Sequence, residues 1–234
     1  MHFRIKSFCL YIIKLLPYLK TTFIYVFVAL LTGIILGLIL TVFKLRKNPF
    51  LKNFSIVYTA IFRSIPPVVL LFLVYYGLTA IAPGNSQNRL FYVCVTLTLL
   101  SSASISEIMR SSYCSVPHGQ YEAGESIGLT DIQIVRRIML PQAFYFALPN
   151  LSTIIIGLLK DGSLAFTIGL VDVFGKANLL NNTSYSKYVL EIYTALAAIY
   201  WILAIIIEKL FFILDGVLSK DKAKDKVTDR ARKG

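Results

Sequence analysis

The fold is decided by the polar stretch Tyr121-Glu122-Ala123-Gly124-Glu125-Ser126-Ile127-Gly128-Leu129-Thr130-Asp131-Ile132-Gln133 and its continuation Arg136-Arg137-Ile138-Met139-Leu140-Pro141. Residues 121–127 have a helix-forming composition. Gly128 then ends the helix, because glycine adopts left-handed backbone angles at little cost. Thr130 or Asp131 can cap a second helix, and Pro141 opens the next segment. We therefore expect two short helices joined at a glycine turn, a shape suited to a cleft in another protein.

The composition around this stretch is that of a membrane protein. Hydrophobic residues make up 56% of the 234 residues and charged residues only 15%, well below the usual quarter. Such a chain cannot cover itself with polar surface in water, so we expect an all-α integral membrane protein. The net charge of +12 comes from basic residues that flank apolar segments, which indicates membrane topology rather than nucleic-acid binding. The cysteines and histidines show no metal-ligand spacing.

Five apolar segments are long enough to span about 30 Å of hydrocarbon. They form one transmembrane domain, 21–215. We expect residues 1–20 to lie along the membrane interface and the charged tail, 216–234, to be disordered at an anionic surface. The predicted spans are about 21–43, 64–81, 90–108, 142–160 and 191–214.

The distribution of lysine and arginine predicts the topology. The basic loop at 44–52, the polar loop at 113–141 and the charged tail belong in the cytoplasm, so five spans place the amino terminus outside. The basic residues before Thr21 run against this rule locally. Outer connections are expected at the turn Pro83-Gly84-Asn85 and in a polar loop, 176–187.

Several residues inside the spans leave two interpretations open. Gly33 and Gly37 either bring two helices close together or face lipid by chance. The hydroxyls of the third span either pack between helices or line a polar path. Asp161, an ionisable residue in a membrane segment, is either functional or an interfacial partner of Lys160. Its position favours a functional role.

Four ordered motifs resemble the permease subunits of bacterial ABC importers over roughly residues 20–215. The EAA loop of that family matches at Glu122, Ala123, Gly128, Ile138, Leu140 and Pro141, and departs at Gly124, where alanine is usual. The polar amino-acid branch is resembled by Phe62-Arg63-Ser64-Ile65-Pro66, by Ser106-Glu107-Ile108-Met109-Arg110 with Ser115-Val116-Pro117-His118-Gly119-Gln120, and by Leu159-Lys160-Asp161-Gly162-Ser163-Leu164-Ala165. Ser163 to Gly169 is similar to permeases for cystine.

This resemblance implies a type I ABC importer permease in the bacterial cytoplasmic membrane that couples the uptake of a polar amino acid to a separate ATPase. ATP and magnesium would bind to that partner, and this chain would hold no catalytic, cofactor or metal site. Other implied partners are an extracellular solute-binding protein, a second permease copy or paralogue, and membrane lipid, but no nucleic acid. ATPase docking is expected at Glu122, Ala123, Gly124, Gly128, Leu129, Thr130 and Asp131.

The resemblance and the residue chemistry also suggest a translocation path and a structural set. The path is expected at Thr98, Ser102, Asp161 and Ser163, and structural roles at Arg63, Pro66, Glu107, Arg110 and Pro141. Glu107 and Arg110 lie one helical turn apart and can form an ion pair.

Two alternative functions come from other classes. An oligomeric channel or an ion-coupled carrier would use the same spans, although such carriers usually show internal repeats, and the sequence shows no convincing one. A membrane enzyme is disfavoured because the sequence has no phosphate-binding loop, HExxH motif or nucleophile motif. Energy for uphill transport must therefore come from a separate subunit.

Overall fold

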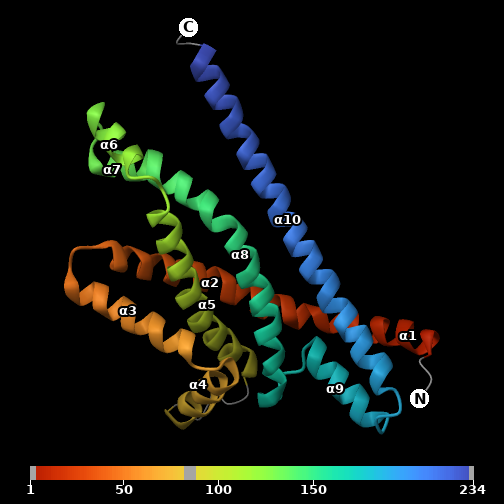
Figure 1. Ribbon diagram of the computed structural model, residues 1–234. Helices are drawn as coiled ribbons and strands as arrows, with labels where there is room; N and C mark the ends of the chain where they lie inside the picture. The colour runs from red at the N-terminus through yellow and green to blue at the C-terminus, as the bar shows by residue number, and fades with distance from the viewer. Residues whose placement is uncertain (1–3, 82–87, 232–234) are drawn as a thin grey trace.

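The described part of the chain, residues 4–81 and 88–231 of this computed structural model, is helical apart from short connections (Figure 1). Side chains are described as far as Gly216. Four helical stretches there are long and apolar enough to cross a membrane: Ile5–Leu45, Arg89–Cys114, Asp131–Ile168 and Val189–Gly216. The pair α3 (Pro49–Ser64) and α4 (Pro67–Ile81), bent by 108°, makes a fifth candidate if it forms one span. The prediction of an all-helical membrane protein is confirmed, with four to five candidate spans.

The first helical stretch contains a break near its start. α1 (Ile5–Leu15) leads through a 3-10 turn that contains Pro17 into α2 (Leu19–Leu45). The predicted span 21–43 therefore lies inside α2. Tyr11 and Leu15 of α1 are buried in a cluster with residues of α9 (Val173–Thr183) and α10 (Val189–Ala231). The amino-terminal segment is thus part of the packed structure.

α2 packs closely against α5 (Arg89–Cys114), and two glycines make this approach possible. A Cβ atom on Gly37 would lie 2.8 Å from Cγ2 of Ile105, and one on Gly33 would collide with Ser101. The Ser101 hydroxyl donates a hydrogen bond to the carbonyl of Ala29, 3.2 Å away. Gly33 and Gly37 therefore serve helix packing and do not face lipid.

The break between α3 and α4 has its cause in two prolines. A residue before proline is pushed out of the helical region, and Ile65, before Pro66, has the extended ψ of 129°. Pro67 then begins α4, where a missing N–H costs little. α3 returns beside α2 (Figure 1), where the Ser55 hydroxyl donates to the carbonyl of Leu40 at 2.8 Å. Pro66, expected to have a structural role, lies at this break.

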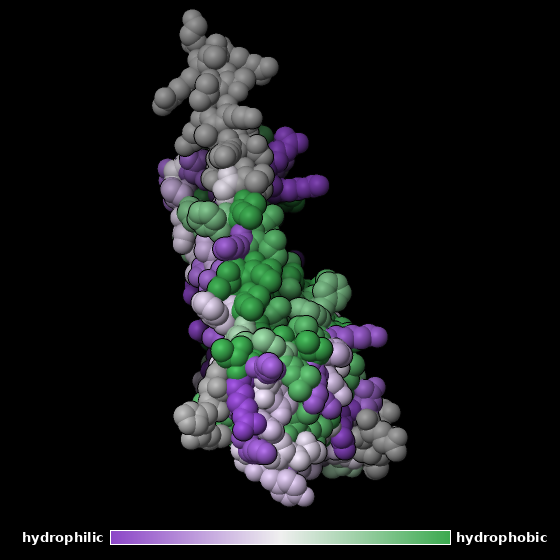
Figure 2. Space-filling view, turned by 90° about the vertical axis from the view of Figure 1, so that its right-hand side faces the viewer, coloured by the Kyte–Doolittle hydropathy of each residue, from purple (hydrophilic) through white to green (hydrophobic). Residues whose placement is uncertain are grey.

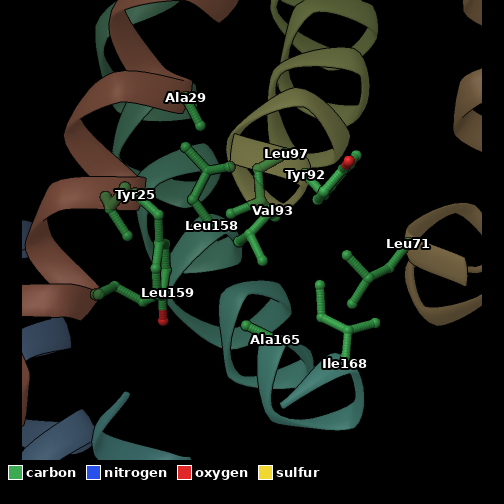
Figure 3. Packing of buried hydrophobic residues seen from close by; sticks show 11 residues of the cluster. Tyr25, Ala29, Leu71, Tyr92, Val93, Leu97, Leu158, Leu159, Ala165 and Ile168 are labelled. Carbon is green, nitrogen blue, oxygen red and sulfur yellow. The ribbon is translucent and has the colours of Figure 1, made fainter. Parts of the chain in front are cut away.

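The main hydrophobic cluster joins four of the helices with the 3-10 helix Ser163–Ile168 (Figure 3). Its central side chains come from α2, α4, α5, α8 (Leu140–Gly162) and that 3-10 helix. They include Tyr25, Ala29, Leu71, Val93, Leu97, Leu158, Leu159, Ala165 and Ile168. This cluster fixes α8 against the α2–α5 pair.

The predicted outer polar loop at 176–187 is wrong for most of its length, because α9 spans Val173–Thr183. The side chain of Asp172 caps this helix by accepting the N–H of Gly175 at 2.8 Å, and it also accepts the Tyr25 hydroxyl at 2.9 Å. Val173 and Ala177 are fully buried. An amino-terminal cap and an apolar face outweigh the asparagine-rich composition that suggested a loop.

The charged tail was expected to be disordered; in the structure α10 continues to Ala231. Lysine, arginine and alanine are strong helix formers, and residues 217–231 contain no glycine or proline to end the helix. The predicted turn Pro83-Gly84-Asn85 lies outside the described residues.

The outer surface carries an apolar band. Figure 2 shows hydrophobic residues across the middle of one face, with hydrophilic residues toward its ends. On α10, Trp201, Ile202, Ile206 and Leu210 are exposed. Such an apolar surface is stable in hydrocarbon and not in water.

We expect Gly37→Ala to destabilise the fold by about 1–3 kcal/mol, because the new methyl group overpacks the α2–α5 contact. The added Cβ would also lie 3.1 Å from the backbone carbonyl of Ser102, so the helix itself must shift. Thermal melting in detergent measures the effect.

Gly77→Ala in α4 is the matched control, since no atom lies within 4 Å of its Cβ position. An equal loss of melting temperature in both variants would contradict the close-packing role of Gly37.

Candidate functional site

The polar loop forms the two predicted helices. α6 (Gly119–Ser126) ends before Gly128, which has a positive φ of 78°, and α7 (Asp131–Ile134) follows. The N–H of Leu129 donates to the carbonyl of Gly124 at 3.1 Å, which closes the end of α6. The N–H of Thr130 donates to Oε1 of Gln133 at 3.0 Å and begins the next helix. The predictions of a left-handed Gly128 and a cap at Thr130 are confirmed.

Side chains within the loop hold the two helices together. The Tyr121 hydroxyl on α6 donates to Oδ1 of Asp131 on α7 at 2.8 Å. This hydrogen bond raises the pKa of Tyr121, because the carboxylate accepts the phenol proton. Beneath the helices, Ile134 and Met139 form a small buried cluster with Val116 and Ala143. The loop is therefore a folded unit with its own core.

The loop residues predicted to dock a partner divide into two groups. Five are exposed at the surface: Glu122, Ala123, Gly128, Thr130 and Asp131. Gly124 is buried, and a Cβ there would lie 2.8 Å from Cγ1 of Ile134. This contact explains why glycine replaces the usual alanine. Leu129 is half-buried and packs against the loop core.

Two exposed apolar side chains in the loop were not predicted as docking residues. Ile127 is 74% exposed and Ile132 is 78% exposed, one on each side of the Gly128 turn. Isolated apolar residues within a polar stretch were the signal in the sequence. Because these two large apolar side chains are exposed beside the same turn, they are candidates for contact with a partner protein.

The loop continues into α8 without a turn. A π-helix, Val135–Met139, joins α7 to α8. Pro141 lies at the start of α8 as predicted, but it does not open a separate segment. Proline has no N–H and its ring crowds the preceding turn, and a π-helical turn is one of the local adjustments that relieve this crowding. One helix therefore runs from Asp131 to Ile168.

A charged cluster closes the end of the α2–α5 pair nearest the loop. Glu107 forms the predicted ion pair with Arg110, at 3.1 Å between Oε2 and Nε. Its other oxygen binds Lys44 of α2, whose side chain is buried. Arg63, exposed at the end of α3, forms no hydrogen bond or ion pair with the described residues. Glu107 and Arg110 therefore have the predicted structural contacts.

A cavity of about 310 Å³, lined by apolar and polar side chains, lies between α5 and α8. Asp161 is the one carboxylate in its lining, and it forms no hydrogen bond or ion pair with any residue that the structure describes. The predicted alternative, an ion pair with Lys160, is not present at contact distance. The lining residues are Leu100, Ser101, Ser104, Ile108, Asn150, Thr153, Ile154, Gly157, Leu158 and Asp161.

The other residues predicted for the path do not line this cavity. Ser102 is fully buried and its hydroxyl lies 2.8 Å from that of Tyr58. Thr98 pairs with the hydroxyl of Thr32 at 2.7 Å. Ser163 donates to the carbonyl of Lys160 at 2.6 Å. In the structure these hydroxyls join helices or bond to their own backbone.

The predicted path did not include four polar lining residues: Ser101, Ser104, Asn150 and Thr153. The signal was helical spacing, because residues three to four positions apart share a face. Asn150 is therefore on the same stripe of α8 as Ile154, Gly157 and Asp161. Among the described residues no three histidine, cysteine, aspartate or glutamate side chains gather in a way that could hold a metal ion.

Known proteins resemble this chain over most of its length. Residues 29–220 match the family described as binding-protein-dependent transport system inner membrane component. The L-cystine transport system permease protein TcyL of Bacillus subtilis (strain 168) is 37% identical over 215 residues, 90% of this chain and 89% of that protein. The probable amino-acid permease protein YxeN of the same organism is 39% identical over 207 residues, 88% and 92% of the two chains.

A solved structure has the same fold. It is described as the crystal structure of an amino acid ABC transporter with histidines. The match has a TM-score of 0.83 and 28% sequence identity, and it covers 92% of this chain and 99% of the other.

The cavity geometry predicts different accessibility for two serines two residues apart on α5. In a background without the native cysteines, we expect Ser104→Cys to react readily with a charged, water-soluble thiosulfonate, because position 104 lines the cavity. Ser102→Cys should react much more slowly, because position 102 is fully buried between α3 and α5. The labelling rates are measured by mass spectrometry. Equal rates at positions 102 and 104 would contradict the assignment of Ser104, and not Ser102, to the cavity lining.

Proposed function

The chain belongs to the family of inner-membrane components of binding-protein-dependent transport systems, and from this premise we propose that it forms the path for a polar amino acid, with cystine as the first candidate. It is the permease subunit of an amino-acid ABC transporter, a multi-pass inner-membrane protein without a catalytic site or cofactor of its own. ATP hydrolysis belongs to a partner ATPase.

The observation that carries the proposed path is the unpaired Asp161 in the cavity between α5 and α8. A carboxylate in a membrane segment is costly unless something pairs with it. The ammonium group of an amino acid supplies the opposite charge. The amide of Asn150 and the hydroxyls of Ser104 and Thr153 supply hydrogen-bond partners for its carboxylate. The volume of about 310 Å³ is at the lower end for small-molecule sites, which span about 300–1,000 Å³.

The charge of the cavity supports a zwitterionic solute over a strongly cationic one. Two turns before Asp161 the cavity is lined by the apolar Ile154, so that Asp161 is the one carboxylate among the described residues of the lining. A side-chain guanidinium would therefore find no second carboxylate. Cystine is supported by the similarity to the L-cystine permease protein of Bacillus subtilis and by the Ser163–Gly169 motif.

We assign ATPase docking to the exposed face of α6 and α7. Glu122, Ala123, Thr130 and Asp131 supply polar contacts in this proposal, and Gly128 sets the angle between the helices. Ile127 and Ile132 join this set as apolar anchors, since both are largely exposed. Gly124 and Leu129 support this face indirectly, because both pack against the core of the loop.

The remaining partners follow from the family. A binding-protein-dependent system needs a solute-binding protein and an ATPase. A second permease, either a copy or a paralogue, would complete the path beside the cavity. We further propose that the α6–α7 loop faces the cytoplasm and the amino terminus faces outward, as the basic residues of 44–52 indicate.

We expect Gly128→Val to reduce recovery of the ATPase in a mild-detergent pull-down, because a β-branched residue is strained at a φ of 78°. The strain changes the angle between α6 and α7. Gly128→Asn is the matched control, since asparagine tolerates left-handed angles and no atom lies near the Cβ position. Equal ATPase recovery with valine and asparagine would count against the docking role of this turn.

Asp161→Asn should lower the uptake of labelled cystine by about tenfold or more, since a hydrogen bond to a charged group contributes about 1.5–3 kcal/mol. Lys160→Gln is the control on the neighbouring residue, which does not line the cavity. Uptake is measured in cells that also express the ATPase and binding protein, with unlabelled arginine, glutamine and methionine as competitors. Unchanged uptake of every amino acid in Asp161→Asn would rule out the proposed path. Competition by arginine stronger than by cystine would refute only the choice of solute.

A further inference from the structure

A second, larger cavity lies on another face of the same helices. It is a groove of about 900 Å³ between α2, α5 and the segment from the π-helix into α8. It shares no lining residue with the cavity that contains Asp161. Apolar side chains make up most of its walls, among them Leu38, Val42, Met109, Leu140, Phe144 and Leu151. None of the functions assigned above uses this groove.

The groove carries positive charge at one end. Arg46, at the end of α2, and Arg136, on the π-helix, contribute to its lining from two different helical segments. Both residues are exposed, and neither side chain forms a hydrogen bond or ion pair with the described residues. The groove therefore combines an apolar channel with two unpaired guanidinium groups.

The length of the groove matches one half of a bilayer. Ile34 and Arg46 both line it, and twelve residues of α-helix span about 18 Å. One leaflet of a bilayer has a hydrocarbon depth of about 15 Å. An acyl chain in the groove would thus reach from the bilayer middle to the two arginines at the headgroup level.

The two arginines make an anionic lipid the best match for the groove. Arginine pairs with phosphate through two parallel hydrogen bonds, and basic clusters next to membrane segments attract anionic lipid. A second copy of this chain is a poor match, because it has 24 basic and only 12 acidic residues. A zwitterionic lipid carries a cation next to its phosphate and gains less from two arginines.

We propose that this groove binds one anionic phospholipid from the leaflet on the side of the α6–α7 loop. Its phosphate pairs with Arg46 and Arg136, and an acyl chain lies along Leu38, Val42 and Phe144. The lipid bridges α2 and the π-helix and thereby stabilises the helix that leads from the loop to Asp161. This inference is independent of which amino acid the permease carries.

The test is native mass spectrometry of the chain, purified in mild detergent with the subunits it retains. The protein is exchanged into equal amounts of dioleoylphosphatidylglycerol or dioleoylphosphatidylcholine, and the retained lipid is counted. We expect preferential retention of phosphatidylglycerol. The double variant Arg46→Gln with Arg136→Gln should reduce the retention of phosphatidylglycerol about fivefold for each arginine removed.

The matched control is Lys47→Gln with Arg137→Gln, which removes the same charge from neighbouring residues that do not line the groove. Retention should stay at the parental level. An equal loss in both double variants would mean diffuse attraction of lipid to a basic surface and would overturn the site.

Val42→Trp tests the apolar part and leaves both arginines in place. Val42 is 48% exposed in the groove wall, so the larger side chain should fill the channel and reduce lipid retention without unfolding the protein. Full retention of phosphatidylglycerol in this variant would overturn acyl-chain binding. Disulfide formation between two copies of Val42→Cys in the intact membrane would assign the groove to a subunit contact instead.

Discussion

The close contact between α2 and α5 is the constraint on which the rest of the structure depends. Lipid gives no hydrophobic driving force between helices, so their association relies on van der Waals packing and hydrogen bonds. Gly33 and Gly37 remove side chains from this contact, which brings the Ser101 hydroxyl within reach of the carbonyl of Ala29. The Lys44–Glu107 ion pair closes one end. With α5 fixed to α2, Ser101 at the edge of this contact and Ser104 beyond it form the cavity wall with α8.

The second constraint is the continuity of the helix from Asp131 to Ile168. It begins in the folded loop, passes the apolar groove and carries Asp161 in the cavity lining. The π-helix Val135–Met139, Pro149 inside α8 and the 3-10 helix Ser163–Ile168 interrupt its regular geometry, and helices bend at such interruptions. One helical stretch with these interruptions therefore joins the two candidate sites.

The sequence predicted features whose cause is local. The Gly128 turn and the cap at Thr130 both follow from the local preferences of the residues themselves. The predictions from the sequence were wrong where contacts between distant parts of the chain determine the local structure. The Asp172 cap and the buried face of α9 override a loop-like composition. The sequence predicted the span that carries the hydroxyls of α5, but it did not show which helix packs against each hydroxyl. Ser102 therefore proved to contact Tyr58, whereas Ser104 lines the cavity.

Asp172 and Asp161 differ in whether the chain itself supplies partners for the carboxylate. Asp172 has no exposed surface, but the Tyr25 hydroxyl and the N–H of Gly175 satisfy its carboxylate. Its burial is explained within the chain. Asp161 has no such partner among the described residues and faces a cavity. A carboxylate in a membrane segment is costly, and Asp161 forms no hydrogen bond or ion pair with the described residues, so its position is not explained within the chain as that of Asp172 is. In the function that we propose, the ammonium group of the transported amino acid supplies the missing partner.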